Sequence, residues 1–231
     1  EIKELIENIK ENKNQKTIEP IIEIAEIPLK NIPQIDLNVE LQTENKFKLP
    51  YLSAEINPIN FASSETIYYP ENRPVILNQM REIIEIEAPI SKSLLFKKIL
   101  KLWYTTRAGA KLNAYLSDVL ESIPEIHKSI AYQDFCWNTS CLPQNLKNYR
   151  DNTIEKRNIE DIAPEEISIP IVEIMEANIS LNKDDLIKLT AKAFGVQKVG
   201  NQINLILNQV IDHMINNNQL LLIEERLRIK D

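Results

Sequence analysis

An internal repeat constrains the fold of this chain more than any other feature of its sequence. When the chain is shifted by 91 residues, the segment Lys92 to Leu112 aligns with the segment Lys183 to Ile203. Copies of a repeat normally fold into the same supersecondary unit, so we expect two copies of one helical unit. The matched pairs are Leu95 with Leu186, Trp103 with Phe194, Gly109 with Gly200, Leu116 with Leu207 and Val119 with Val210.

Each copy shows the same succession of patterns. Apolar spacing of three and four residues predicts helices over 75–87, 92–103 and 107–123 in the first copy, with Ser91 as a cap, and residues 129–137 suggest a strand pair. In the second copy it predicts helices over 165–177, 183–194, with Asn182 as a cap, and 199–217, followed by strands over 220–223 and 226–229. Helix-turn-helix with added strands is the winged-helix order. The predicted fold is therefore mainly α with small β wings, as tandem duplicated winged-helix units.

The first part of the chain has a different character. Residues 2–13 have one apolar face and predict a short amphipathic helix. Over residues 17–69, Ile-rich runs are interrupted by prolines, which disfavour helix, so we expect an extended tether with an edge strand near 20–27. Because residue 1 is Glu rather than Met, we expect a fragment of a longer protein. The predicted domains are a connector (1–68), the first winged-helix-like repeat (69–140), a polar linker (141–163) and the second repeat (164–231).

Charge is unevenly distributed along the chain. The formal net charge is −7, and residues 1–90 carry this whole excess, with 16 acidic and 9 basic side chains. The segment Ser91 to Lys111 has six Lys and Arg residues and no acidic residue. The two stretches therefore require different electrostatic partners.

Catalytic motifs are absent from the sequence. Three glycines, Gly109, Gly195 and Gly200, cannot form a phosphate-binding loop or a dinucleotide fingerprint, so we expect no enzyme activity and no cofactor. His127 and His213 lack a nucleophile motif nearby. Cys136 and Cys141 suit a reducing cytoplasm, and with His127 they are too few for a zinc site. No apolar run is long enough to cross a membrane.

Three further features are interpreted structurally. The acidic run from Glu160 to Glu166 is interpreted as a solvated helix start rather than a metal-binding set. Trp103 and Phe194 are expected to anchor equivalent cores. For Gly109 and Gly200, close helix packing is favoured over close approach of the backbone to a phosphate.

The run YPENRPVILNQMREIIEIEAPISKSLLFKKILKLWYTTRAGAKL, followed by FCW and IEDIAPEEI, resembles the uncharacterised domain at the C-terminal end of large bacterial superfamily-one DNA helicases. The resemblance covers residues 69–222. Members of that family show an aromatic residue followed by Arg-x-Gly-x-Lys/Arg-hydrophobic, here Trp103, Arg107, Gly109, Lys111 and Leu112. In the second copy Lys198 replaces the Arg, and Gln202 replaces the basic residue. The resemblance implies DNA-processing work by a parent protein that carries an ATP-dependent helicase core and often a very-short-patch-repair-type endonuclease fold.

Two functions follow as expectations. The first is a non-catalytic DNA-binding module, in which the helix-turn-helix of the first copy contacts duplex DNA. The alternative is a protein-interaction or autoregulatory module that packs on the helicase core of the same parent chain through the acidic tether and the second copy. The expected DNA-binding residues are Lys101, Thr105, Thr106, Arg107 and Lys111, with Lys198 from the second copy.

Overall fold

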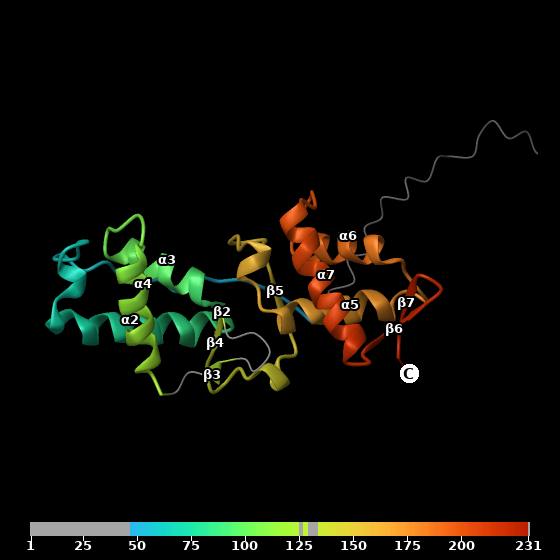
Figure 1. The fold of residues 1–231 in the computed structure, drawn as a ribbon, viewed down its shortest axis with the longest axis horizontal. Helices are drawn as coiled ribbons and strands as arrows, with labels where there is room; N and C mark the ends of the chain where they lie inside the picture. Colours follow the sequence, from blue (N-terminus) through green and yellow to red (C-terminus); the bar gives the residue numbers. More distant parts are fainter. Residues whose placement is uncertain (1–46, 125–126, 129–133, 231) are drawn as a thin grey trace, which may run out of the picture. The chain divides into compact units, whose positions relative to one another are not determined.

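The computed structural model describes residues 47–124, 127–128 and 134–230. The described residues all belong to one compact unit, Glu44–Asp231. The helix expected over 2–13 and the strand expected over 20–27 lie outside the described residues. Within them the fold is mainly helical with small strands, as the sequence predicted (Figure 1).

The first helix group (residues 73–137) contains α2 (Arg73–Glu87), α3 (Lys92–Leu102) and α4 (Ala110–Glu121). Pro74 lies in the first turn of α2, where its missing N–H costs no hydrogen bond. The Ser91 hydroxyl accepts a hydrogen bond from the Leu94 N–H at 2.9 Å and caps α3 as expected. Three short strands form an antiparallel sheet in the order β2-β4-β3: β2 (Ile90–Ser91), β3 (His127–Lys128) and β4 (Phe135–Trp137).

The second helix group (residues 164–229) repeats this order with α5 (Pro164–Glu176), α6 (Lys183–Ala193) and α7 (Asn201–Asn216). The Asn182 side chain accepts a hydrogen bond from the Asp185 N–H at 2.8 Å and caps α6. Strands β6 (Leu220–Ile223) and β7 (Arg226–Ile229) form a hairpin, and Leu181 bridges to Leu227 on β7.

The 91-residue shift relates the two helix groups in detail. Helices α3 and α6 correspond end to end, and the Ile90–Cys136 pair corresponds to the Leu181–Leu227 bridge. Each group has its own apolar core, and Trp103 and Phe194 are both completely buried, as expected. Trp103 Nε1 donates a hydrogen bond to Gln79 Oε1 at 2.9 Å, which satisfies the buried indole.

The turn after the second helix of each group is also the same. The Thr105 N–H donates to the Leu100 carbonyl at 2.8 Å, and the Val196 N–H donates to the Ala191 carbonyl at 3.0 Å. Tyr104 and Gly195 occupy equivalent positions with φ of 49° and 76°, a left-handed conformation that ends a helix. The predicted starts of the third helices are therefore wrong. Because the turn comes first, α4 begins at residue 110 rather than 107, and α7 begins at residue 201 rather than 199.

The regions flanking the first helix group are more structured than a tether and a linker. Strand β1 (Lys48–Pro50) pairs in parallel with β5 (Tyr149–Asp151), so part of the expected connector pairs with part of the expected linker. Tyr149 packs edge-on against Phe194, with 5.4 Å between the ring centroids. Short 3-10 helices occupy Thr66–Tyr68, Pro70–Asn72, Pro143–Asn145 and Ile159–Asp161. No helix in the described part of the chain has the length and apolar character needed to span a bilayer.

Candidate nucleic-acid interface

The expected DNA-binding residues of the first helix group surround the turn between α3 and α4. Lys101 lies in the last turn of α3 and is exposed, as are Thr106 and Arg107 in the turn. Thr105 is half-buried, and its hydroxyl donates to the Trp103 carbonyl at 3.0 Å. Lys111 is exposed in the first turn of α4, with Nζ 5.2 Å from the centroid of the Tyr68 ring. The turn therefore brings all five expected residues into one region.

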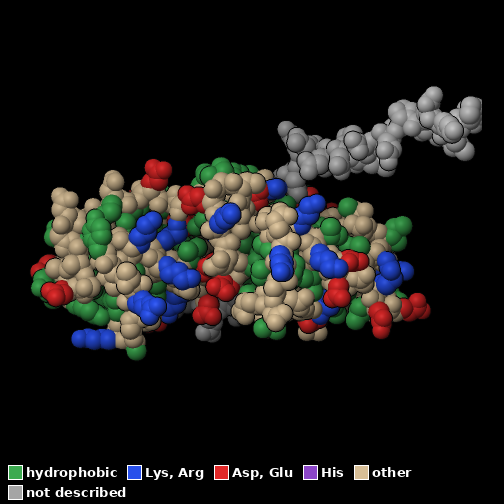
Figure 2. Space-filling model, turned by 90° about the horizontal axis from the view of Figure 1, so that it is seen from above, with side chains coloured by type: hydrophobic (Ala, Val, Ile, Leu, Met, Phe, Trp, Pro, Cys, Tyr) green, Lys and Arg blue, Asp and Glu red, His purple; other side chains and the backbone are tan. Residues whose placement is uncertain are grey.

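A groove runs beside this turn. Lys97, Leu100, Thr106 and Arg107 line a hollow of about 810 Å³, and Lys97, Leu100 and Thr106 also line a neighbouring hollow that reaches Lys101. Figure 2 shows Lys and Arg side chains gathered over the part of the surface that contains α3 and α4. Three acidic residues, Asp134, Glu160 and Asp161, also line the larger hollow.

The six cations of the basic segment are not equally available. Lys98 Nζ lies 3.0 Å from Glu87 Oε1 and also donates to the Ser53 hydroxyl, so this cation pairs with a buried carboxylate. Lys97 Nζ lies 3.9 Å from Asp161 Oδ2. Among the described residues, Lys101, Arg107 and Lys111 form no ion pair, which leaves their charges available to a ligand in solution.

The outward face of α4 is basic only at its start. Beyond Lys111, Asp118 accepts a hydrogen bond from Arg73 at 2.6 Å, and Glu121 ends the helix. A duplex that meets this helix along its whole length therefore meets two carboxylates. Cationic contacts are confined to the turn and the first turn of α4.

The two repeated glycines are helix caps. Gly109 and Gly200 are the N-cap residues of α4 and α7, where glycine is readily accommodated. A Cβ built on either residue meets no atom within 4 Å, so the predicted close helix packing is wrong. The open space leaves the first turn of each helix accessible.

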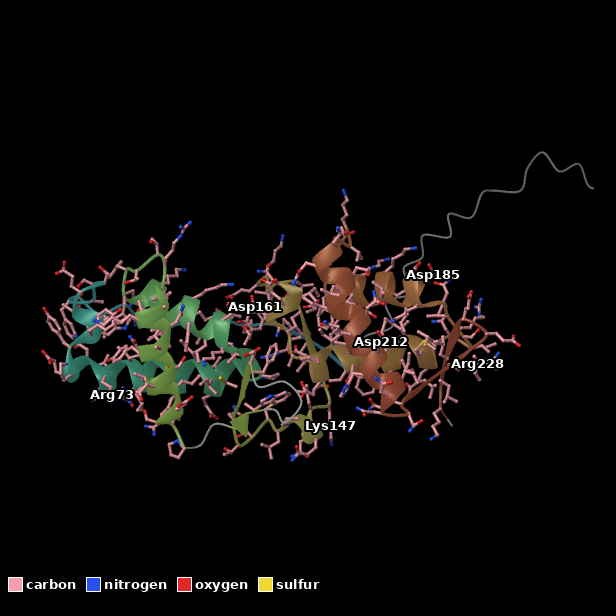
Figure 3. All side chains as sticks on the ribbon, in the orientation of Figure 1. Arg73, Lys147, Asp161, Asp185, Asp212 and Arg228 are labelled. Carbon is pink, nitrogen blue, oxygen red and sulfur yellow. The ribbon has the colours of Figure 1, made fainter. Side chains whose placement is uncertain are left out.

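The equivalent turn of the second helix group carries less available charge. Lys192 and Lys198, at the positions of Lys101 and Arg107, are exposed, and Gln202 stands where the first group has Lys111. Two other lysines are engaged, Lys183 with Asp212 at 2.6 Å and Lys188 with Asp185 at 3.2 Å. Asp212 on α7, Asp185 on α6 and Arg228 on β7 are labelled in Figure 3.

An ionic cluster that the sequence did not reveal lies in the interior. Glu166 is fully buried and pairs with Arg150 and with Arg157, each at 2.8 Å. Arg150 Nη1 also donates to the Glu87 carbonyl at 2.7 Å, and the Arg157 guanidinium lies 4.3 Å from the ring centroid of Tyr51. The interpretation of Glu160 to Glu166 as a solvated helix start is wrong for Glu166 and for Asp161, which is 3% exposed and accepts from the Ser91 hydroxyl at 2.6 Å.

The electrostatics of the ionic cluster suit a structural role. Burial alone raises the pKa of Glu166, but the charges of Arg150 and Arg157 and their hydrogen bonds lower it to about 2. Burial and the hydrogen bond to Glu87 raise the pKa of Tyr51. These shifts hold the carboxylate charged and the phenol neutral, and neither group titrates near neutral pH. Sequence patterns missed the cluster because its members come from separate parts of the chain: the residue after β1, the end of α2, β5, the segment after β5, and α5.

The remaining candidate residues are the possible metal ligands and the two histidines. No group of three His, Cys, Asp or Glu side chains is placed to hold a metal ion in the described part of the chain. His213 lies exposed on α7, and its Nε2 lies 2.7 Å from the Asn217 amide nitrogen. His127 belongs to β3.

Comparison with known proteins gives one match. Residues 65–114 match the model of a family described as a protein of unknown function, DUF3320. The match extends through α2, β2 and α3 into the start of α4 and agrees with the expected uncharacterised domain. No curated protein and no solved structure matches the chain.

Proposed function

We propose that this chain is a non-catalytic accessory module of an ATP-dependent DNA helicase and that its first helix group binds duplex DNA. The association with a helicase rests on the family resemblance over residues 69–222. The match to an uncharacterised domain over residues 65–114 falls within or beside that region. The chain's own contribution is to engage the duplex, while strand separation belongs to the helicase core of the parent protein.

We assign both helix groups to the winged-helix class. Three features support this assignment: the helix, strand, helix, turn, helix order, the antiparallel strands that follow, and the sheet order β2-β4-β3. In this class the third helix faces the major groove, and the turn before it meets the DNA backbone. By this placement α4 and α7 are the recognition helices of the two groups.

One observation carries the assignment to DNA. Lys101, Arg107 and Lys111 are exposed around the turn before the recognition helix, next to the exposed Thr106, while the Thr105 hydroxyl donates to the Trp103 carbonyl. Cations and a hydroxyl at this place suit phosphate oxygens, and Arg107 also has the geometry to read a guanine edge. Because the contacts are mainly to phosphates, we expect weak and largely sequence-independent affinity.

The test compares the whole chain with the double variant Arg107→Glu, Lys111→Glu on a labelled duplex at several salt concentrations. With about three phosphates neutralised, log K should fall with log salt at a slope near −3 for the wild type. We expect the double variant to bind roughly tenfold more weakly with a slope closer to −1. A matched control, Lys147→Glu with Lys230→Glu, reverses two exposed charges away from the turn and should bind like the wild type.

The second candidate is a protein-interaction or autoregulatory module. The exposed apolar side chains of Phe47, Leu49 and Leu52, on and beside the edge strand β1, favour this candidate, because such a strand can pair with another chain. Equal DNA binding by the wild type and the Arg107, Lys111 double variant would remove DNA from the proposal and support this alternative. In either case we expect the purified chain neither to hydrolyse ATP nor to cleave DNA.

A further inference from the structure

The outward face of α7 carries uncharged amides where α4 carries charges. Residues 199–211 contain no charged side chain. The inward face of the helix, with Leu207, Val210, Ile211 and Met214, is buried in the core of the second helix group. The spacing of 3.6 residues per turn places the exposed residues on one outward stripe. Within 199–211 they are Asn201, Gln202, Asn204, Leu205 and Gln209.

The start of this stripe is open to a large ligand. Gly200 caps the helix, and a Cβ at that position would meet nothing within 4 Å. Lys198 stands immediately before the cap and is exposed, so a nucleic-acid backbone that approaches the helix start meets a cation. Asp212 lies on the far half of α7, where Lys183 pairs with it at 2.6 Å.

The chemistry of the stripe matches base edges better than phosphates. An Asn or Gln amide donates one hydrogen bond and accepts another, which pairs with N7 and N6 of adenine in the major groove. Leu205 is 54% exposed in the middle of the stripe, although leucine is usually buried. An apolar side chain at that place suits the methyl group of thymine. Phosphate oxygens, in contrast, call for the cations that the stripe lacks.

We infer that α7 is the base-reading helix of this chain and that it favours A·T pairs in the major groove of duplex DNA. The first helix group supplies most of the affinity, and α7 supplies sequence preference. This inference rests on the proposed function, because the phosphate contacts of the first group hold the duplex that α7 reads.

The experiment begins with selection of preferred sites from a randomised duplex library by the whole chain. The selected duplex is then compared with a copy in which its shared A·T pairs are changed to G·C. We expect the wild type to prefer the selected duplex by at least about fivefold, since each good base contact discriminates by that much or more. The triple variant Asn201→Ala, Gln202→Ala, Gln209→Ala should prefer it by less than about twofold and bind the G·C copy as the wild type does.

Controls separate the two proposals. The variant Asn78→Ala, Gln144→Ala removes two exposed amides outside α7 and should keep the full preference. Thermal unfolding of each variant, followed by circular dichroism, should match the wild type because every changed residue is exposed. If the wild type binds duplex with the salt dependence given above but selects no site, the α7 inference fails and the proposed function stands. Unchanged preference in the triple variant also overturns the inference, and absence of duplex binding by the wild type overturns both proposals.

Discussion

The two helix groups have the same interior and different surfaces. Leu95 and Leu186 are both buried in their second helices, and Trp103 and Phe194 both close their cores at the following turn. On the outside, Lys111 of α4 corresponds to Gln202 of α7. The same scaffold therefore presents cations in one group and amides in the other.

Packing explains why the surfaces differ and the cores agree. A buried side chain touches neighbours on all sides, so a change in its volume costs free energy. An exposed side chain on a helix has no such restriction, and its chemistry can suit a ligand. Buried residues therefore stabilise the fold, and exposed residues are free to contact a partner. The variants below change one kind of residue or the other.

The largest expected effect comes from the equivalent core anchors. Trp103→Ala and Phe194→Ala should each lower the free energy of unfolding by about 3–5 kcal/mol, because each leaves a large cavity in its own core. Trp103→Ala should cost more of the two, since it also leaves the buried Gln79 without its indole partner. Urea unfolding followed by circular dichroism measures both losses. A loss below 1 kcal/mol in one variant alone would show that the cores are not equivalent.

The next largest expected effect is a loss of folding stability at acid pH, caused by the ionic cluster. The pKa of Glu166 is about 2 in the folded protein, against an ordinary value of 4.5. A depressed folded pKa adds stability that is complete above the unfolded value and is lost as pH falls toward the folded value. We therefore expect the wild type to lose stability between about pH 4.5 and pH 2. Glu166→Gln should be destabilised at pH 7 by roughly 3 kcal/mol, because it leaves two buried arginines without their carboxylate.

Comparison of acid titrations tests this assignment. The free energy of unfolding is measured for the wild type and for Glu166→Gln at pH 7, 4.5 and 3. The difference between the two proteins should shrink as pH falls, since protonation of Glu166 in the wild type removes the same charge. Glu165→Gln, at the adjacent and less buried position of α5, is the matched control and should show a smaller change at each pH. A constant difference at all three values would assign the acid sensitivity to other groups.

Periodicity in the sequence predicted the helices well because burial sets that periodicity. The caps Ser91 and Asn182 and the burial of Trp103 and Phe194 were predicted, and the helix starts erred by a few residues at the turn before α4 and α7. That turn depends on left-handed backbone at Tyr104, a residue type that gives no signal for it. Gly195 is its counterpart in the second helix group, and glycine is a residue type that does indicate such a turn.

Long-range pairing was the part that sequence patterns could not supply. Lys48 and Tyr149 are partners in the β1–β5 pair, yet each three-residue strand is too short to show alternation. Arg150 lies in the segment interpreted as a polar linker and Glu166 in the run interpreted as a solvated helix start, yet the two form an ion pair in the interior. The residues of the candidate interface lie close together in sequence between Lys101 and Lys111, so the sequence alone could predict that they share one region.

The smallest expected effect concerns the equivalent cations Arg107 and Lys198. Arg107 lies near exposed Lys101 and Lys111, which form no ion pair with other described residues, so their fields add at a phosphate. In the second helix group, exposed Lys192 corresponds to Lys101, but Gln202 replaces Lys111, so fewer cations add to the field of Lys198. Arg107→Glu should therefore weaken duplex binding roughly fivefold and Lys198→Glu only about twofold, each uniformly across sequences and with a salt slope reduced by about 1. Fluorescence anisotropy at two salt concentrations measures both variants. Equal losses would mean that the two turns contact the duplex alike, and a loss for Lys198→Glu that varies with sequence would assign base reading to the turn rather than to the amides of α7.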